Sequence, residues 1–158
     1  MTADVDLVAD LLPSNVALFA ESLRPDYYVD ERMILDAISR RSCFNVIHYP
    51  TSFKVDIFAV KNRRYDKNVM DRVEERYLDE GIPVSRFSLP SVEDTLLAKL
   101  EWYRLGDEVS ERQWSDVVGV IKVNIASLDR QYLERWSGEL GVADLLAKAW
   151  NEGESALS

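Results

Sequence analysis

The spacing of apolar residues changes along this 158-residue chain, and that change limits the folds open to it. In the first 90 residues, the runs 4–9 and 53–60 alternate polar with apolar residues, as half-buried β-strands do. From Ser91 onward the apolar residues follow helical spacing. The pattern predicts an α/β fold with a small mixed sheet and flanking helices over residues 1–90. A helical C-terminal region, residues 91–158, packs on it to give one compact unit.

Start and stop signals place the individual elements. In the first 90 residues they predict strands at 4–9, 44–49, 53–60 and 83–89, and helices at 14–23, 30–41 and 66–78. In the remainder they predict helices at 91–105, 110–123, 129–140 and 142–150, with a frayed end at 153–158. A turn at 50–52 indicates a hairpin, Asp30 is the expected cap of its helix, and Ser91 with Asp94 forms a capping box.

Composition limits the context in which the chain works. The 47% hydrophobic content is typical of a packed core, and the net charge of −9 argues against broad binding to nucleic acid, which needs clustered Lys and Arg. One cysteine, Cys43, and one histidine, His48, exclude an internal disulfide and a zinc cluster. We find no signal peptide and no apolar run of membrane-spanning length, so we expect a soluble cytoplasmic protein without a membrane partner.

Three aspartates lie on the predicted strands. Asp4 and Asp6 share a face, because residues i and i+2 of a strand point to the same side. Asp56 is the one acidic residue in an otherwise apolar strand, which predicts partial burial and a partner. If the two strands are neighbours, three carboxylates converge and repel one another unless protons or a divalent cation relieve the repulsion. That is the arrangement for holding Mg²⁺ and a polyphosphate. The alternatives are a solvated edge strand for the first pair, and an ion pair of Asp56 with Lys54 or an arginine.

Two charged residues on predicted helices are further candidates. Lys99 lies at the margin of an apolar stripe, where its ammonium either extends into solvent or points into a cleft toward an anion. Asp116 lies on a helix that is apolar nearly all round, which favours partial shielding. The alternative for Asp116 is a structural salt bridge, with Arg112 or with a residue of another helix.

We interpret His48 as a core or hairpin residue, and the four tryptophans as packing residues or a dimer face.

Four short motifs, in this order, resemble the nucleotidyltransferase-fold superfamily, and within it small bacterial proteins related to AbiEii-type abortive-infection toxins. Residues 2–7 (TADVDL) look like the Asp-x-Asp strand, and residues 53–58 (FKVDIF) look like the strand with the third carboxylate. Residues 91–100 (SVEDTLLAKL) are similar to the Ser-Pro-Glu-Asp…Lys-Leu helix of that branch. Residues 112–117 (RQWSDV) are similar to its Arg-x-x-x-Asp helix. The resemblance covers most of the chain.

The resemblance implies a nucleotidyltransferase. By it, Asp4, Asp6 and Asp56 are the catalytic residues and bind Mg²⁺ or Mn²⁺, while Lys99 and Asp116 bind the nucleotide. The implied reaction is attack of a hydroxyl on the α-phosphate of a nucleoside triphosphate, with pyrophosphate leaving. Two metal ions activate the nucleophile and stabilise the leaving oxygens.

The chain departs from the family pattern at one place. The family has a strand and a Gly-Gly or Gly-Ser turn into a helix before the Asp-x-Asp strand, and the glycines let the backbone approach the triphosphate. Here the Asp-x-Asp run begins at Asp4, so we interpret the fold as N-terminally truncated. Three explanations are open: the chain is shortened from a longer reading frame, a partner completes the site, or catalysis is lost and the fold serves binding.

Two functions of different classes follow from these patterns. One is a nucleotidyltransferase-like protein that keeps a carboxylate site for a divalent metal and a nucleotide. The other is a non-catalytic interaction protein, a toxin–antitoxin component or a dimeric scaffold, in which the carboxylates are structural. The bare sheet edge predicts a homodimer, through that edge or through the tryptophan-bearing helices. A hydrolase with paired carboxylates is disfavoured. The two carboxyl groups of such an enzyme face each other across a cleft, roughly 5–9 Å apart, whereas Asp4 and Asp6 sit side by side on one predicted strand.

Overall fold

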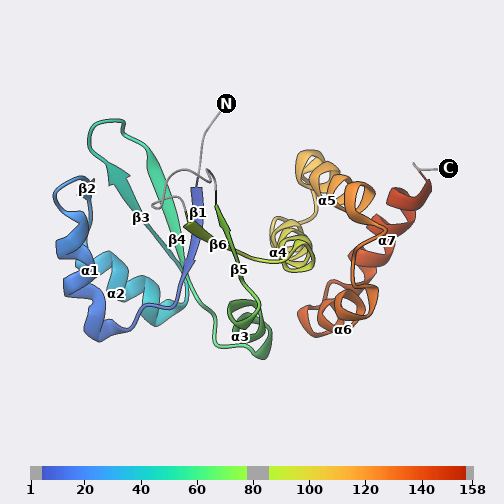
Figure 1. The fold of residues 1–158 in the computed structure, drawn as a ribbon, viewed down its shortest axis with the longest axis horizontal. Helices are drawn as coiled ribbons and strands as arrows, with labels where there is room; N and C mark the ends of the chain where they lie inside the picture. The colour runs from blue at the N-terminus through green and yellow to red at the C-terminus, as the bar shows by residue number, and fades with distance from the viewer. Residues whose placement is uncertain (1–4, 78–85, 156–158) are drawn as a thin grey trace. The chain divides into compact units, whose positions relative to one another are not determined.

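The computed structural model describes residues 5–77 and 86–155. Contacts within the chain divide it into two compact units, Met1–Arg63 and Arg64–Ser158. The first combines strands and helices and the second is mainly helical, so the mixed α/β class is confirmed (Figure 1). By this division the segment 64–90 groups with the helices, whereas the sequence pattern groups it with the sheet. The packing of residues 91–158 on residues 1–90 as one compact unit stays a prediction.

The first unit contains a four-stranded sheet. In chain order its elements are β1 (Val5–Ala9), η1 (Pro13–Asn15), α1 (Val16–Leu23), β2 (Tyr27–Tyr28), α2 (Glu31–Arg40), β3 (Cys43–His48) and β4 (Lys54–Ala59). The strand order across the sheet is β1-β4-β3-β2. β1 runs parallel to β4, and the other two pairs are antiparallel, which confirms the predicted hairpin of β3 and β4.

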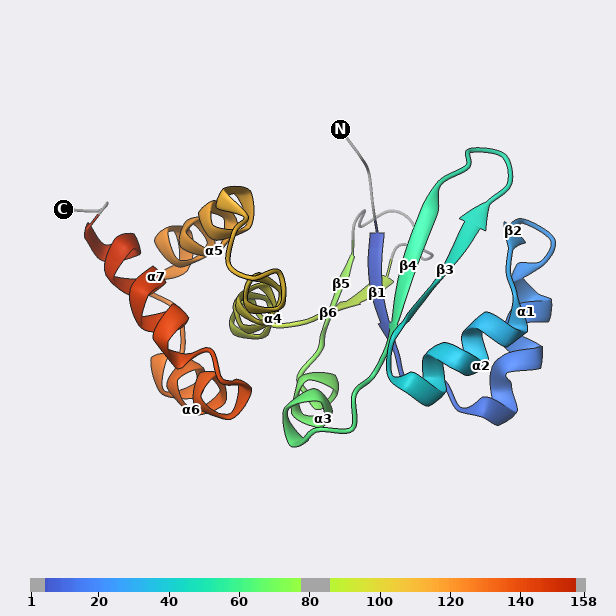
Figure 2. The same ribbon diagram turned by 180° about the vertical axis from the view of Figure 1, so that it is seen from behind.

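Helices α1 and α2 pack on one face of this sheet (Figure 2). Apolar residues of both helices, β3 and β4 form the core: Val16, Ala20, Ile34, Ala37, Ile38, Phe44, Val46 and Ile57. Because side chains alternate along a strand, Asp56 points to the opposite face, away from α1 and α2. Asp30 caps α2 as predicted, since its carboxylate accepts the backbone N–H of Arg32 at 2.8 Å.

The second unit is built mainly from helices packed on one another. Its described elements are α3 (Arg64–Asp71), β5 (Glu74–Tyr77), β6 (Arg86–Leu89), α4 (Val92–Leu105), α5 (Glu111–Asn124), α6 (Arg130–Leu140) and α7 (Ala143–Ser155). Ser91, Ser110 and Asp129 cap α4, α5 and α6, each accepting a backbone N–H, and Ser91 receives that of Asp94 as predicted. The core includes Leu96, Leu97, Leu100, Val117, Ile121 and Leu133.

A carboxylate is buried among the helices of this unit. Asp94 is 2% exposed and accepts hydrogen bonds from the Ser91 hydroxyl at 2.9 Å and the Tyr132 hydroxyl at 2.6 Å. The Arg72 guanidinium lies 4.0 Å from the same carboxylate and 3.8 Å from the centroid of the Tyr132 ring. Asn68 donates to the Tyr132 hydroxyl at 2.7 Å. These contacts join the α3 region, α4 and α6.

Two predicted elements differ from the structure. The helix expected at 66–78 is wrong in its second half, because α3 ends at Asp71 and Glu74–Tyr77 is strand β5. Antiparallel pairing with β6 satisfies the backbone groups of β5 and outweighs local helix propensity. The frayed end is wrong for residues 153–155, which continue α7 while Gly153 is buried against Ile121. Residues 78, 83–85 and 156–158 of the expected elements lie outside the described residues.

Candidate functional site

The sheet brings two of the three predicted aspartates together. Asp6 of β1 and Asp56 of β4 are register partners, and Asn45 of β3 is the register partner of Asp56 on its other side. Side chains of register partners point to the same face, so these three form one row across three strands, here named the Asp6–Asp56 row. The row lies on the face that α1 and α2 do not cover. Asp4, the third predicted ligand, lies outside the described residues.

Asp56 has an ion-pair partner on its own strand. The Nζ of Lys54 lies 2.8 Å from Oδ2 of Asp56, and the Asp56 side chain is 21% exposed. The two residues are separated by one position, so they share the face opposite α1 and α2. The structure thus contains the ion pair that the sequence left open as the alternative to a metal site.

The negative field of the row reaches the next row of the sheet. Cys43 and Phe58 are register partners in that row. Partial burial raises the pKa of the Cys43 thiol above its ordinary value, and the charges of Asp56 and, more weakly, Asp6 raise it further. The backbone of Ile57 and the charge of Lys54 act in the opposite direction. Both carboxylates therefore act on one side of the sheet.

The oxygen atoms of the row are of the kind that a hard divalent cation prefers. Mg²⁺ keeps several waters and is usually bound by one or two carboxylates together with substrate phosphates, and Asp6 and Asp56 supply two carboxylates. Within residues 5–77 and 86–155, no group of three or more His, Cys, Asp or Glu side chains is placed to hold a metal ion. A cation at the row would therefore need phosphate oxygens and water as further ligands. The row does not fit a cage made by the described side chains alone.

Lys99 and Asp116 lie in the second unit and contact each other. The Nζ of Lys99 on α4 is 3.3 Å from Oδ2 of Asp116 on α5, with both side chains partly exposed. The sequence left open a salt bridge between Asp116 and a residue of another helix. The structure contains that salt bridge, and the partner of Asp116 is Lys99, the other candidate nucleotide-binding residue. An ion pair with this exposure contributes little to stability, about 0–1 kcal/mol, so either residue can exchange its partner for a ligand at low cost.

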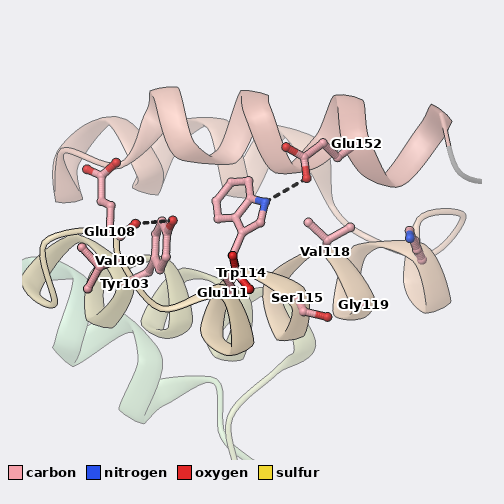
Figure 3. A pocket seen from close by; sticks show the side chains of 10 residues that line it. Tyr103, Glu108, Val109, Glu111, Trp114, Ser115, Val118, Gly119 and Glu152 are labelled. Atoms are coloured by element: carbon pink, nitrogen blue, oxygen red, sulfur yellow. Dashed lines mark hydrogen bonds between the residues drawn. The ribbon is translucent and has the colours of Figure 1, made fainter.

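A pocket in the second unit was not indicated by any sequence pattern. It has a volume of about 590 Å³ and lies along α5 and α7, beside the loop that follows α4 (Figure 3). Its lining residues are Tyr103, Glu108, Val109, Glu111, Trp114, Ser115, Val118, Gly119, Lys122 and Glu152. Helical spacing of Glu111, Ser115 and Gly119 places them on one stripe of α5. The contact of this stripe with α7 depends on helix packing between distant segments, which explains why the sequence did not reveal it.

The other residues considered from sequence have local roles. His48 contacts the Tyr27 ring, with centroids 5.0 Å apart, and its Nδ1 lies 2.8 Å from the Thr51 hydroxyl, so it belongs to the hairpin. Trp136 and Trp150 are buried in the core of the second unit.

The fold and the row define a mixed α/β sheet unit with paired carboxylates, joined in sequence to a helical unit. No protein-family model matches the chain, and no curated protein matches it. None of the helices in the described part of the chain is long and apolar enough to cross a membrane.

Proposed function

We propose that the chain is a nucleotidyltransferase-like protein that binds Mg²⁺ or Mn²⁺ and a nucleoside triphosphate at the Asp6–Asp56 row. The observation that carries the proposal is the register of β1 on β4. That register pairs two carboxylates, with the Asn45 amide beside them, on a sheet face that α1 and α2 leave uncovered. Two carboxylates plus phosphate oxygens are a usual ligand set for Mg²⁺ with a nucleotide. The order of the four motifs along the chain supports the same class.

In this function Asp6 and Asp56 bind the cation and orient the triphosphate on the face opposite α1 and α2. Lys54 exchanges its ion pair with Asp56 for a phosphate oxygen, because its ammonium lies on the same face. A cation held by Asp6 and Asp56 would neutralise charge on the phosphates and lower the pKa of an attacking hydroxyl. That hydroxyl would lose its proton to solvent and form a bond to the α-phosphate, as the bond to the leaving pyrophosphate breaks.

The test is calorimetric titration of Mn²⁺, with and without a non-hydrolysable nucleoside triphosphate analogue. We expect Asp6→Asn and Asp56→Asn to weaken metal-dependent nucleotide binding at least tenfold, a loss of about 1.4 kcal/mol, because each removes one charged ligand while keeping its size. Asp71→Asn, on an exposed position at the end of α3, is the matched control and should bind as the wild type does. Equal binding by the wild type and both row variants would contradict the proposal.

The second candidate is a non-catalytic interaction protein, a toxin–antitoxin component or a dimeric scaffold. The observation that favours it is that two of the candidate carboxylates have lysine partners without a ligand, Asp56 with Lys54 and Asp116 with Lys99. This function predicts that metal and nucleotide have no effect on the wild type. It also predicts that Asp56→Asn changes the free energy of unfolding without any change in ligand binding.

A further inference from the structure

The pocket along α5 and α7 has an aromatic wall. The rings of Tyr103 and Trp114 lie 5.1 Å apart at an angle of 38°. The Trp114 indole points toward α7, where its Nε1 donates a hydrogen bond of 2.8 Å to Oε2 of Glu152 (Figure 3). The Nζ of Lys148 lies 4.4 Å from the centroid of the same indole. The ring surroundings therefore already hold one cation.

The loop after α4 closes one end of the pocket in a defined conformation. Asp107 and Glu108 have φ angles of 57° and 60°, in the left-handed region that few residues other than glycine adopt. The Tyr103 hydroxyl donates to the carbonyl of Glu108 at 2.6 Å, and Arg104 pairs with the Glu108 carboxylate. This arrangement leaves Val109 78% exposed beside the pocket. These contacts fix the conformation of the loop, which exposes the Val109 side chain to solvent.

Three carboxylates, those of Glu108, Glu111 and Glu152, line the pocket together with Lys122. Glu108 is paired with Arg104, so the carboxylates of Glu111 and Glu152 are the ones available to a ligand. In the described part of the chain, Glu111 makes no side-chain hydrogen bond or ion pair, and the bond from Trp114 leaves one oxygen of Glu152 for a ligand. Space is open beside Gly119 of α5, because a Cβ added there would meet no atom within 4 Å. We expect a side chain from outside to reach the carboxylates through this space.

We propose that this pocket binds an arginine side chain from a basic segment of a partner protein. A guanidinium pairs with several carboxylate oxygens at once, which matches the two glutamates, and it replaces the Lys148 ammonium over the Trp114 ring. An aliphatic residue beside the arginine covers Val109. A volume of about 590 Å³ is within the usual range for ligand pockets, and the net charge of −9 favours encounter with a basic partner. The site is separate in its residues from the Asp6–Asp56 row and from Lys99 and Asp116, so it goes beyond the proposed function.

The test uses the full chain and a capped Arg-Leu-Arg tripeptide at about 0.15 M salt, where long-range attraction is screened. The readout is the indole N–H resonance of Trp114 in a nitrogen–proton correlation spectrum, identified by its loss in Trp114→Phe. We expect the tripeptide to shift this resonance in a saturable way. Glu111→Gln with Glu152→Gln should weaken the affinity at least tenfold, while the indole bond is kept because glutamine also accepts a hydrogen bond.

The controls separate a specific pocket from general charge attraction. The double variant Glu21→Gln with Glu139→Gln carries the same net charge but changes exposed residues that do not line the pocket, and it should bind as the wild type does. A capped Glu-Leu-Glu tripeptide should not bind. Equal weakening in both double variants, equal binding of the acidic peptide, or no shift with Arg-Leu-Arg would each overturn the proposal. A shift that depends on protein concentration without any peptide would make a second copy the occupant and would also overturn it.

Discussion

The carboxylate of Asp56 lies beside one cation and one anion. The cation is Lys54 of its own strand, and the anion is Asp6 of the neighbouring strand. In the absence of ligand, the ammonium offsets part of the repulsion between the carboxylates. A metal ion bound at the row competes with that ammonium. The two candidate functions therefore differ most in what they predict for substitution of Lys54.

Lys54→Met should strengthen Mn²⁺ binding if the row is a metal site. Removing the competing ammonium should raise the affinity about fivefold, equivalent to about 1 kcal/mol for a partly exposed ion pair. In the presence of Mn²⁺, the same variant should bind the triphosphate analogue more weakly than the wild type does, because the phosphate loses the Lys54 ammonium as a partner. Paramagnetic resonance of free Mn²⁺ measures the first effect and calorimetry the second. A variant that only lowers the melting temperature, with Mn²⁺ binding absent before and after, would favour a structural ion pair.

Asp107→Gly should stabilise the protein by about 0.5 kcal/mol. A side chain costs about 1–2 kcal/mol in the left-handed region, less for Asp, and the added freedom of glycine in the unfolded chain offsets part of the gain. Gly141 allows the opposite substitution, because it also has a left-handed φ, 69°, and a Cβ added there would meet no atom within 4 Å. Gly141→Ala should therefore lower the free energy of unfolding by about 1 kcal/mol through backbone strain alone. Urea unfolding measures both. A loss of stability in Asp107→Gly would contradict the left-handed assignment.

At the scale of the elements, local signals explain which parts could be predicted. The N-caps Ser91, Ser110 and Asp129 mark helices within a few residues, because a cap depends on its own neighbours. Strand β5 could not be predicted, since its sequence suits a helix and its pairing partner β6 is a separate segment. The sequence places Asp6 and Asp56 on strands, but their side-by-side register is a contact between distant segments. For the same reason the ion pair of Lys99 with Asp116 was one alternative among several.

The packing of α7 on α5 can be tested at Gly153. A Cβ there would lie 2.8 Å from Cγ2 of Ile121, so Gly153→Ala should cost about 1–3 kcal/mol by overpacking. Gly138→Ala in α6 is the matched control. An added Cβ meets nothing within 4 Å there, and helix propensity should stabilise that variant by about 0.5–1 kcal/mol. Chemical unfolding gives both values, and similar effects at the two glycines would show that α7 does not pack this closely.

The buried network that joins the α3 region, α4 and α6 should make stability depend on pH in the alkaline range. Burial, followed by the influence of Asp94, raises the pKa of both Tyr65 and Tyr132 above the ordinary value of about 10. The folded state then keeps protons that the unfolded state releases. This contribution is therefore complete below about pH 10 and is lost as the pH rises toward the folded pKa values.

Tyr132→Phe is the variant that tests this dependence. Without the hydroxyl, the buried Asp94 carboxylate loses one donor, which should cost about 1–3 kcal/mol near pH 8. The decline of stability between about pH 9.5 and pH 11 should be shallower than in the wild type, because one of the two perturbed tyrosines is gone. Urea unfolding over this range provides the slope. An unchanged slope would mean that Tyr132 titrates in the folded state as it does in the unfolded state.

At the scale of the whole molecule, the candidate residues are divided between two compact units. Asp6 and Asp56 belong to Met1–Arg63, and Lys99, Asp116 and the α5–α7 pocket belong to Arg64–Ser158. Each unit has its own core cluster, so each can respond to its own ligand. The nucleotide experiment and the arginine-peptide experiment therefore change residues of different units.

The predicted homodimer can be tested at the sheet edge. β1 pairs with β4 on one side, while in the described residues no strand pairs with its other side, and Val5, Leu7 and Val8 are 41%, 45% and 61% exposed. Unpaired, apolar strand edges tend to pair with a second chain, and a lysine on the edge opposes this. Val8→Lys should therefore weaken self-association at least tenfold in sedimentation velocity. Val123→Lys, 84% exposed on α5, is the matched control and should leave it unchanged. A reversed result would place the interface on the helices, and a wild type that stays monomeric at all concentrations would contradict the homodimer.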